Sequence, residues 1–325
     1  MRSLNKNKEI LRFLNRFGFF LMVIILPTTL LLFFGDDPLE TDEYLAAMTD
    51  KHQRIDSIKE SKLILAGGSN LVFGIDSQII EQQLKIPVVN LGLQASLGLN
   101  FILNELEDVA KKGDIIVLSI EHSVTAKGNK ELQKMTSYYN PFARKYYNKE
   151  HDQRFKKVIV FIESQHIVFK KTISKYIEKL KNDPVYTRNA LNKYGDGIYH
   201  LDLPSQSVLG SRSILNSNRD TEITLLNQFN NKMKKRGVSV LFSYGAYEIE
   251  EFEKNKKTLH KIHQDFKNKL EIEMITNLED FVYPTSYFYD SVYHLNKTGR
   301  EIHTKNVIFR LQNSIIITHN SNIDY

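Results

Sequence analysis

The chain has 325 residues, no cysteine, a net charge of +6 and a hydrophobic content of 42%. This length favours one large domain with an anchor or an insertion, and the apolar content is sufficient for a buried core. The lack of cysteine excludes a disulfide framework, thiol catalysis and cysteine-ligated metals. Neither metal-ligand spacing of His, Asp and Glu nor a phosphate-binding glycine loop occurs, so we expect no metal and no cofactor.

The excess positive charge lies at the N-terminus, where residues 1–16 carry five basic residues against one acidic residue. The rest of the chain is therefore nearly neutral and lacks the electrostatic footprint of a nucleic-acid-binding protein. Residues 17–34 follow without a charge and span about 27 Å as a helix, close to the thickness of a bilayer core. We predict a cytoplasmic tail over 1–16, a transmembrane anchor over 17–34 and an extracytoplasmic body. A cleaved signal peptide is the alternative.

After a polar segment over 35–60, which we interpret as a stalk with a short helix near 43–48, the chain alternates between two patterns. Continuous apolar runs indicate strands buried on both faces, as in a parallel sheet. The segments between them, such as 78–84 and 99–110, have helical spacing. We predict a three-layer, doubly wound parallel α/β domain over 61–310 and a C-terminal tail over 311–325. The five apolar runs are residues 62–67, 87–93, 114–120, 238–244 and 270–275.

Residues 123–220 break this alternation. They contain a polar, aromatic-rich stretch and a helical pattern over 155–181, and we interpret them as a mainly helical insertion between the third and fourth strands. The insertion either covers and shapes a site or is structural packing; the sequence favours neither reading.

Ser69 lies in Gly67-Gly68-Ser69-Asn70, directly after the first predicted strand. A strand-to-helix turn at the edge of an α/β sheet presents a hydroxyl outward, and glycines allow the tight backbone path that such a turn needs. An N-cap serine in an ordinary turn is the alternative reading.

Asp290 and His294 follow the last predicted strand, in a loop expected at the same edge of the sheet as Ser69. An imidazole can take the proton of a serine hydroxyl. A carboxylate on the other ring nitrogen fixes the tautomer and stabilises the imidazolium. Together these residues predict one serine-type acyl-transfer site.

Three blocks of the sequence, Ser69, then Asn90-Leu91-Gly92, then Asp290 with His294, resemble the SGNH (GDSL-type) hydrolase superfamily. More narrowly, GGSNLVFGID, NLGL and YHLNKTG are similar to exported, membrane-anchored SGNH-like proteins that accompany membrane-bound O-acyltransferases, including the lipoteichoic-acid D-alanylation protein group. The resemblance covers roughly residues 60–310 in block order, without the insertion, and implies an SGNH/flavodoxin-like fold.

The resemblance also implies roles: Ser69 as nucleophile, His294 as base with Asp290 orienting it, and the N–H groups of Ser69 and Gly92 as oxyanion donors. Two features depart from the family pattern. Glu121 stands where the family supplies an oxyanion-binding asparagine, and an ionised carboxylate cannot donate a hydrogen bond. The site is then either slow or borrows a donor such as Asn70. Three residues rather than two separate the Asp from the His.

The sequence thus predicts a membrane-anchored, extracytoplasmic serine O-acyltransferase or esterase. It would act on a cell-envelope polysaccharide or polymer through an acyl-Ser69 intermediate, with a membrane-bound O-acyltransferase as a partner and without nucleic acid. The alternative is a non-catalytic partner subunit of the same fold that docks on such an acyltransferase or presents substrate to it.

Overall fold

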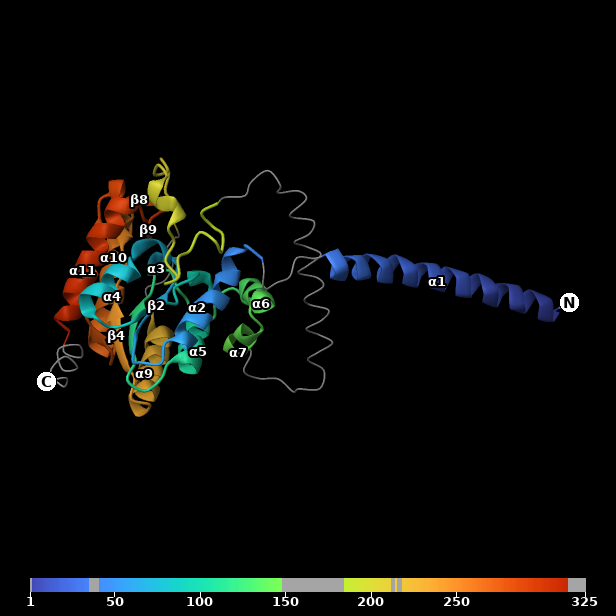
Figure 1. Cartoon of the computed structure of the whole chain (residues 1–325), viewed down its shortest axis with the longest axis horizontal. Coiled ribbons are helices and arrows are strands. Elements are labelled where there is room, and N and C mark those ends of the chain that lie inside the picture. The colour runs from blue at the N-terminus through green and yellow to red at the C-terminus, as the bar shows by residue number, and fades with distance from the viewer. Residues whose placement is uncertain (1, 35–40, 148–183, 212–213, 215–217, 315–325) are drawn as a thin grey trace. The chain divides into compact units, whose positions relative to one another are not determined.

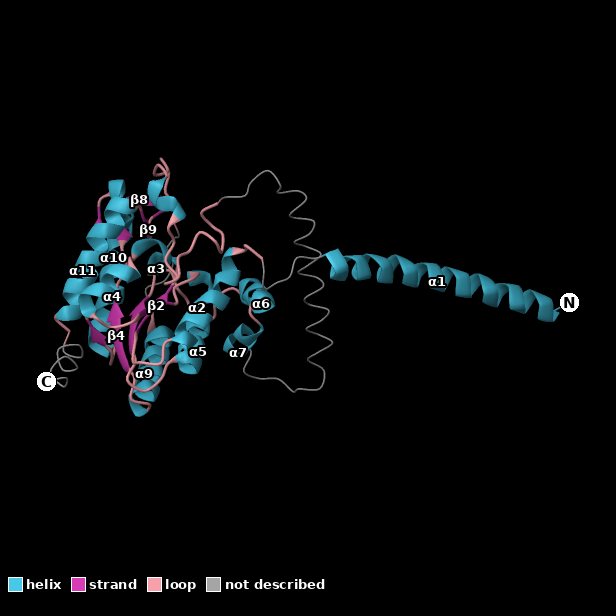
Figure 2. Cartoon of the chain, in the orientation of Figure 1, coloured by secondary structure: helices cyan, strands magenta, loops and turns pink. Residues whose placement is uncertain are grey.

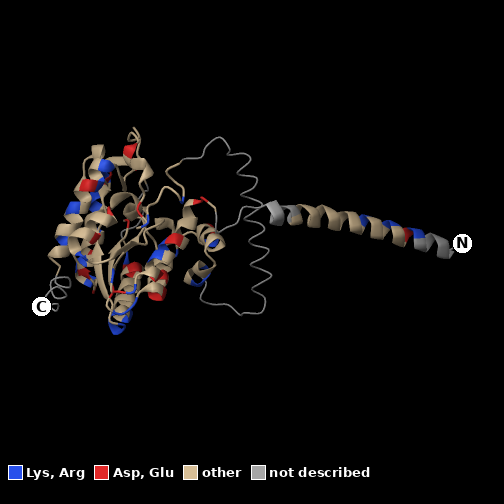
Figure 3. Ribbon diagram, in the orientation of Figure 1, with Lys and Arg blue, Asp and Glu red and all other residues tan. Residues whose placement is uncertain are grey.

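The computed structural model of the chain describes residues 2–34, 41–147, 184–211, 214 and 218–314 (Figure 1). These residues belong to two compact units. One contains the helix α1, Arg2–Phe34, and the other contains the described residues from 42 onward. Within α1, Lys8–Pro27 is long and apolar enough to cross a membrane, although a signal sequence would pass the same test. Lysines and arginines occupy the N-terminal part of α1 and an uncharged stretch follows (Figure 3).

The second unit is built on a five-stranded, all-parallel sheet (Figure 2). Its strand order is β2-β1-β3-β4-β6, so the predicted parallel α/β sheet is confirmed. The strands form from the five predicted apolar runs, the last of which contributes only two residues. Their bounds are β1 Leu63–Gly67, β2 Val88–Asn90, β3 Ile115–Ser119, β4 Ser239–Ser243 and β6 Glu273–Met274.

Helices cover both faces of this sheet, because successive strand residues point to opposite sides. Leu63 and Leu65 of β1 pack in one apolar cluster, whereas Ile64 and Ala66 pack in another. Apolar residues at helical spacing, such as Leu103 and Leu106 of α5, fill the second cluster. The first cluster is covered by α3 Ser69–Gly74, α4 Ser77–Leu84 and α11 Lys297–Gln312, and the second by α2 Ala47–Ser57, α5 Leu99–Val109, α9 Asp220–Lys235 and α10 Ile249–Lys269.

Short elements form the rest of the unit. Two of them, β8 and β9, pair as an antiparallel hairpin directly before α11, and β5 pairs with β7. The bounds are η1 Tyr44–Ala46, η2 Ala95–Leu97, α6 Lys130–Tyr139, η3 Pro141–Ala143, α7 Arg144–Tyr147, η4 Tyr199–Asp202, β5 Tyr247–Glu248, β7 Val282–Tyr283, η5 Thr285–Tyr287, β8 Phe288–Ser291 and β9 His294–Leu295.

The predicted stalk over 35–60 is wrong from residue 42 onward, since this segment folds into the α/β unit. Met48 and Ile55 of α2 are buried. Lys51 is buried as well, because its ammonium donates to the carbonyl oxygens of Asn90 at 2.9 Å and Gly195 at 2.7 Å. A lysine in a polar sequence is normally exposed to solvent, so the sequence of α2 did not indicate that the side of the helix with Lys51 is buried.

Two other predicted boundaries also change. The predicted start of the tail at residue 311 is wrong, because α11 runs to Gln312 and Leu311 is fully buried in the first apolar cluster. In the predicted insertion, α6, α7 and the segment from residue 184 belong to the α/β unit. The helix predicted over 155–181 lies outside the described residues, as do 35–40 and 315–325.

Candidate active site

Ser69 lies at the carboxyl edge of the sheet, as the first residue of α3. There the last residue of β1, Gly67, is in register with Ser119 of β3. A Cβ on Gly67 would overlap the Ser119 carbonyl oxygen, and one on Gly68 would come within 2.5 Å of the Glu121 carboxylate. The close approach of these groups therefore requires glycine at both positions. The turn places the buried Ser69 hydroxyl between two groups of polar side chains.

One group, which we call the base side, consists of Tyr186, Asp290 and His294. His294 Nε2 lies 2.9 Å from Ser69 Oγ, and His294 Nδ1 lies 2.8 Å from Asp290 Oδ1. The β8–β9 hairpin explains this contact, because Ser291 pairs with His294 across a tight turn. The extra residue between Asp290 and His294 is thus accommodated by the turn, and the structure brings all three predicted residues together.

Asp290 is held ionised by its neighbours. Burial alone would raise the pKa of its carboxyl group. The hydrogen bond and charge of His294, followed by the hydrogen bond from Tyr186, outweigh burial and hold this pKa below its usual value. An ionised Asp290 keeps the Nδ1 proton on His294 and leaves Nε2 free to accept a proton from Ser69.

Tyr186 is a member of the base side that the sequence did not indicate. Its hydroxyl donates to Asp290 Oδ2 at 2.6 Å and lies 3.1 Å from His294 Nδ1. Its ring packs against Phe73, with centroids 5.4 Å apart. It lies 104 residues from Asp290 in the chain, and a tyrosine in an aromatic-rich segment carries no signal that it will meet a distant carboxylate.

His200 holds β9, the strand that carries His294, in place. Its Nε2 donates to the carbonyl oxygen of Leu295, the residue after His294, at 3.0 Å. Burial, followed by the positive charge of Arg300, lowers the pKa of His200 to about 4. His200 is therefore neutral near pH 7 and acts as a fixed hydrogen-bond donor that holds β9.

The second group, which we call the oxyanion side, consists of Asn70, Gly92 and Glu121. Glu121 Oε1 lies 3.3 Å from Ser69 Oγ and accepts a hydrogen bond from the Asn70 backbone N–H at 3.2 Å. Burial and then the charge of Glu121 raise the pKa of the neighbouring Tyr44 hydroxyl. A carboxylate thus occupies the space beside Ser69, where a serine nucleophile would need donors for a developing oxyanion.

Ser69 consequently has two competing acceptors for its single proton. His294 Nε2 lies at 2.9 Å and Glu121 Oε1 at 3.3 Å, and a hydroxyl can donate to only one of them in this way. Proton transfer to His294 is the productive direction for a serine nucleophile. The hydrogen bond to Glu121 competes with that direction.

Two predicted oxyanion donors are directed elsewhere. The Gly92 N–H donates to Asn90 Oδ1 at 2.9 Å. The Asn70 side-chain amide donates to Ser119 Oγ at 3.0 Å. In this arrangement neither group points at the space next to Ser69, which corrects the roles expected for Gly92 and for the Asn70 side chain. The Asn70 backbone N–H does point there, against Glu121.

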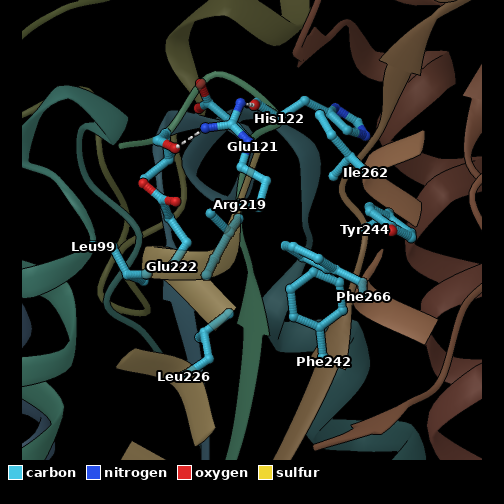
Figure 4. A pocket seen from close by; sticks show the side chains of 12 residues that line it. Leu99, Glu121, His122, Arg219, Glu222, Leu226, Phe242, Tyr244, Ile262 and Phe266 are labelled. Atoms are coloured by element: carbon cyan, nitrogen blue, oxygen red, sulfur yellow. Dashed lines mark hydrogen bonds between the residues drawn. The ribbon is translucent and has the colours of Figure 1, made fainter. Parts of the chain in front are cut away.

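Arg219, another residue that the sequence did not indicate, holds the loop that carries Glu121. Its guanidinium donates to the carbonyl oxygens of His122 at 2.7 Å and Val124 at 3.2 Å (Figure 4). An apolar cavity of about 30 Å³ lies under this loop, which is room for one or two water molecules but not for an acyl chain. His122 stacks on Tyr244 there, and burial, followed by the charge of Arg219, lowers its pKa to about 4.

Comparisons of the chain with protein-family models, with curated proteins and with solved structures find no match. The base side has the arrangement that activates a serine hydroxyl, namely a base within hydrogen-bond reach and a carboxylate that orients the base. The oxyanion side has a carboxylate where such chemistry normally uses donors.

Proposed function

We propose that the chain is a serine acyl-transfer enzyme, either an O-acyltransferase or an esterase, that works through an acyl-Ser69 intermediate. The observation that carries this proposal is the continuous chain of hydrogen bonds from Ser69 Oγ to His294 Nε2 at 2.9 Å and from His294 Nδ1 to Asp290 at 2.8 Å. The resemblance of the same residues to the SGNH hydrolase blocks supports it.

In the first step, Ser69 Oγ attacks the carbonyl carbon of an ester while its proton passes to His294 Nε2. The C–O bond of the ester breaks, and His294 returns the proton to the departing alcohol oxygen. This leaves the acyl group on Ser69. An acceptor hydroxyl then gives its proton to His294 and attacks the acyl carbon, and Ser69 regains a proton. Water as acceptor gives hydrolysis, and an alcohol gives transfer.

We place this chemistry outside the cytoplasmic membrane. The basic residues before the apolar part of α1 favour an N-terminus in the cytoplasm. The substrate that we propose is an acylated cell-envelope polysaccharide or polymer, and a membrane-bound O-acyltransferase is the partner. Both follow from the resemblance of GGSNLVFGID, NLGL and YHLNKTG to membrane-anchored SGNH-like proteins.

The direct test is covalent labelling with a fluorophosphonate probe, which reacts with activated serines. The full chain in detergent should be labelled, and Ser69→Ala should abolish the labelling. Ser207→Ala, at an exposed position, is the matched control and should be labelled like the wild type. Equal labelling of the wild type and Ser69→Ala would eliminate Ser69 as the nucleophile.

A second candidate function is a non-catalytic partner subunit, and the position of Glu121 favours it. A carboxylate 3.3 Å from Ser69 Oγ opposes the negative charge that acyl transfer develops. In this case the fold would dock on a membrane-bound O-acyltransferase or present its substrate. Cells carrying Ser69→Ala would then retain polymer acylation, whereas cells lacking the chain would lose it. Loss of acylation in both strains would favour the enzyme.

A further inference from the structure

An open, polar cavity of about 290 Å³ lies between two loops at the carboxyl edge of the sheet. One loop follows β2 and contributes Ala95 and Ser96, and the other follows β3 and contributes residues 123–125 with Gly128 and Asn129. We call it the loop cavity. A single water molecule needs only about 10–15 Å³, so the loop cavity has room for a ring-sized ligand.

The two loops are fixed to one another by their backbones. The N–H of Asn129 donates to the Ser96 carbonyl oxygen at 2.7 Å, and the N–H of Leu99 donates to the Thr125 carbonyl oxygen at 3.0 Å. Gly98 and Gly128 have φ values of +85° and +66°, and a Cβ on either would overlap the backbone of the other loop. The cavity is therefore formed without a ligand. Binding then costs less conformational entropy, because the two loops need not be ordered by the ligand.

Two walls of the loop cavity contact neighbours of Ser69 on the oxyanion side. Ala95, one of its walls, lies against Gly68, because a Cβ on Gly68 would come within 2.7 Å of the Ala95 Cβ. Val124, another wall, donates its N–H to the Glu121 carbonyl oxygen at 3.0 Å. Both loops that line the cavity therefore also contact the immediate surroundings of the nucleophile.

The chemistry of the lining favours a neutral ligand rich in hydroxyl groups. The described side chains that line the cavity are uncharged. Ser96, Ser123 and Thr125 contribute hydroxyl-bearing side chains to the lining, and Asn129 contributes an amide. Asn129 Oδ1 caps α6 by accepting from Glu131 N at 2.9 Å and Leu132 N at 3.1 Å, so its amide NH₂ is the end available to a ligand. Paired hydroxyl and amide groups recognise hydroxyls by donating and accepting together.

We propose that the loop cavity binds the alcohol part of the ester, a neutral sugar or polyol unit, and positions its hydroxyl for transfer to or from Ser69. This rests on the proposed acyl-transfer function and adds the substrate class and its site. An anionic unit is disfavoured, because the described lining offers no cationic side chain to pair with it.

The experiment is a binding measurement that needs no catalysis. Saturation-transfer NMR on the full Ser69→Ala chain in detergent would use methyl glucoside, methyl N-acetylglucosaminide, ribitol, glycerol and glycerol 1-phosphate as probes. We expect at least one neutral probe to bind and glycerol 1-phosphate not to bind. Thr125→Trp fills the cavity from an exposed position and should abolish binding. Gln83→Trp adds the same ring on the exposed face of α4 and should leave binding intact.

A milder variant guards against a folding artefact. Thr125→Val keeps the shape of the side chain and removes one hydroxyl, so we expect affinity for the bound probe to fall about five-fold, with an unchanged melting temperature. The proposal is overturned if no neutral probe binds, if only glycerol 1-phosphate binds, or if Thr125→Trp binds as well as Gln83→Trp. Fluorophosphonate labelling of Ser69 in the wild type reports separately on the proposed function, so the two failures are distinguishable.

Discussion

Ser69 faces two regions that are built in opposite ways. On the base side, Tyr186, Asp290 and His294 form an uninterrupted hydrogen-bonded chain that ends 2.9 Å from Ser69 Oγ. On the oxyanion side, Glu121 accepts from the Asn70 backbone N–H and competes with His294 for the Ser69 proton. Activation of a serine hydroxyl and stabilisation of transition-state charge are separate requirements of an acyl-transfer site. The base side has the geometry for the first, and Glu121 lies where the second would need donors.

The largest expected effect comes from removing the base. His294→Ala should lower the rate of fluorophosphonate labelling about 10³- to 10⁴-fold, because the hydroxyl loses its proton acceptor. The measurement is a time course of labelling on the full chain in detergent. His260→Ala, at an exposed surface position, is the control and should label at the wild-type rate. A decrease of less than ten-fold would mean that the base side does not activate Ser69.

Acid should weaken both regions, because a buried neutral histidine lies next to each, His200 beside the base side and His122 beside the oxyanion side. The pKa of His122 and that of His200 are both lowered to about 4, whereas an unfolded histidine titrates near 6.5. Their contribution to stability is complete above pH 6.5 and is lost as the pH falls towards 4. By pH 5 each should cost roughly 2 kcal/mol.

Thermal melting of the full chain at pH 7.5 and pH 5.0 would measure this loss. His200→Gln keeps an N–H donor for the Leu295 carbonyl oxygen. Because burial also lowers the pKa of His303, to about 3, His200→Gln should reduce the pH dependence by about a third. A melting temperature that does not change between the two pH values would contradict the buried, neutral state of these histidines.

Glu121→Gln tests the oxyanion side. Glutamine has nearly the same shape, carries no charge and can donate a hydrogen bond. Because one oxyanion donor is worth about 10²–10³-fold in rate, we expect the turnover of p-nitrophenyl acetate to rise about ten-fold or more. Glu107→Gln, which breaks a surface ion pair with Lys232, should leave it unchanged. A fall in turnover for Glu121→Gln would show instead that the carboxylate takes part in the reaction.

Tyr186→Phe gives the smallest expected effect and refines the base side. It removes one hydrogen bond to an ionised carboxylate, worth about 1.5–3 kcal/mol, so labelling should slow about ten-fold. The pKa of Asp290 should rise, as measured by carbon NMR titration, because Tyr186 is one of the groups that hold it down. Tyr146→Phe removes an equivalent hydrogen bond, to Asp108, and should change neither quantity. Unchanged labelling and an unchanged pKa in Tyr186→Phe would leave Tyr186 as a packing residue.

The sequence predicted the parts of this molecule that depend on local pattern and on the topology of parallel sheets. Continuous apolar runs located β1 and β3 because both faces of these strands are buried. Once the strands were placed, the rule that ligand-binding loops gather at their carboxyl ends put Ser69 and His294 at one edge. The contact of Asp290 with His294 also follows from local structure, because it is made within one hairpin.

What the sequence did not predict depends on contacts between distant segments. Tyr186 and Arg219 reach the site from segments whose path is set by tertiary packing, and neither lies in a recognisable motif. The direction of the Gly92 N–H is decided by a local hydrogen bond to Asn90, which the block pattern does not encode. The position of Glu121 in the block pattern indicates that it is unusual, but its contacts with Ser69 Oγ and the Asn70 N–H depend on tertiary structure.

The most direct test of the proposed acyl transfer is to trap an acyl group on Ser69. The full chain in detergent would be mixed with p-nitrophenyl acetate, quenched in acid within seconds, digested and analysed by mass spectrometry. We predict an acetyl group on the peptide that contains Ser69, absent in Ser69→Ala and greatly reduced in His294→Ala. An unmodified Ser69 peptide in the wild type, or equal acetylation in His294→Ala, would contradict acyl transfer through Ser69.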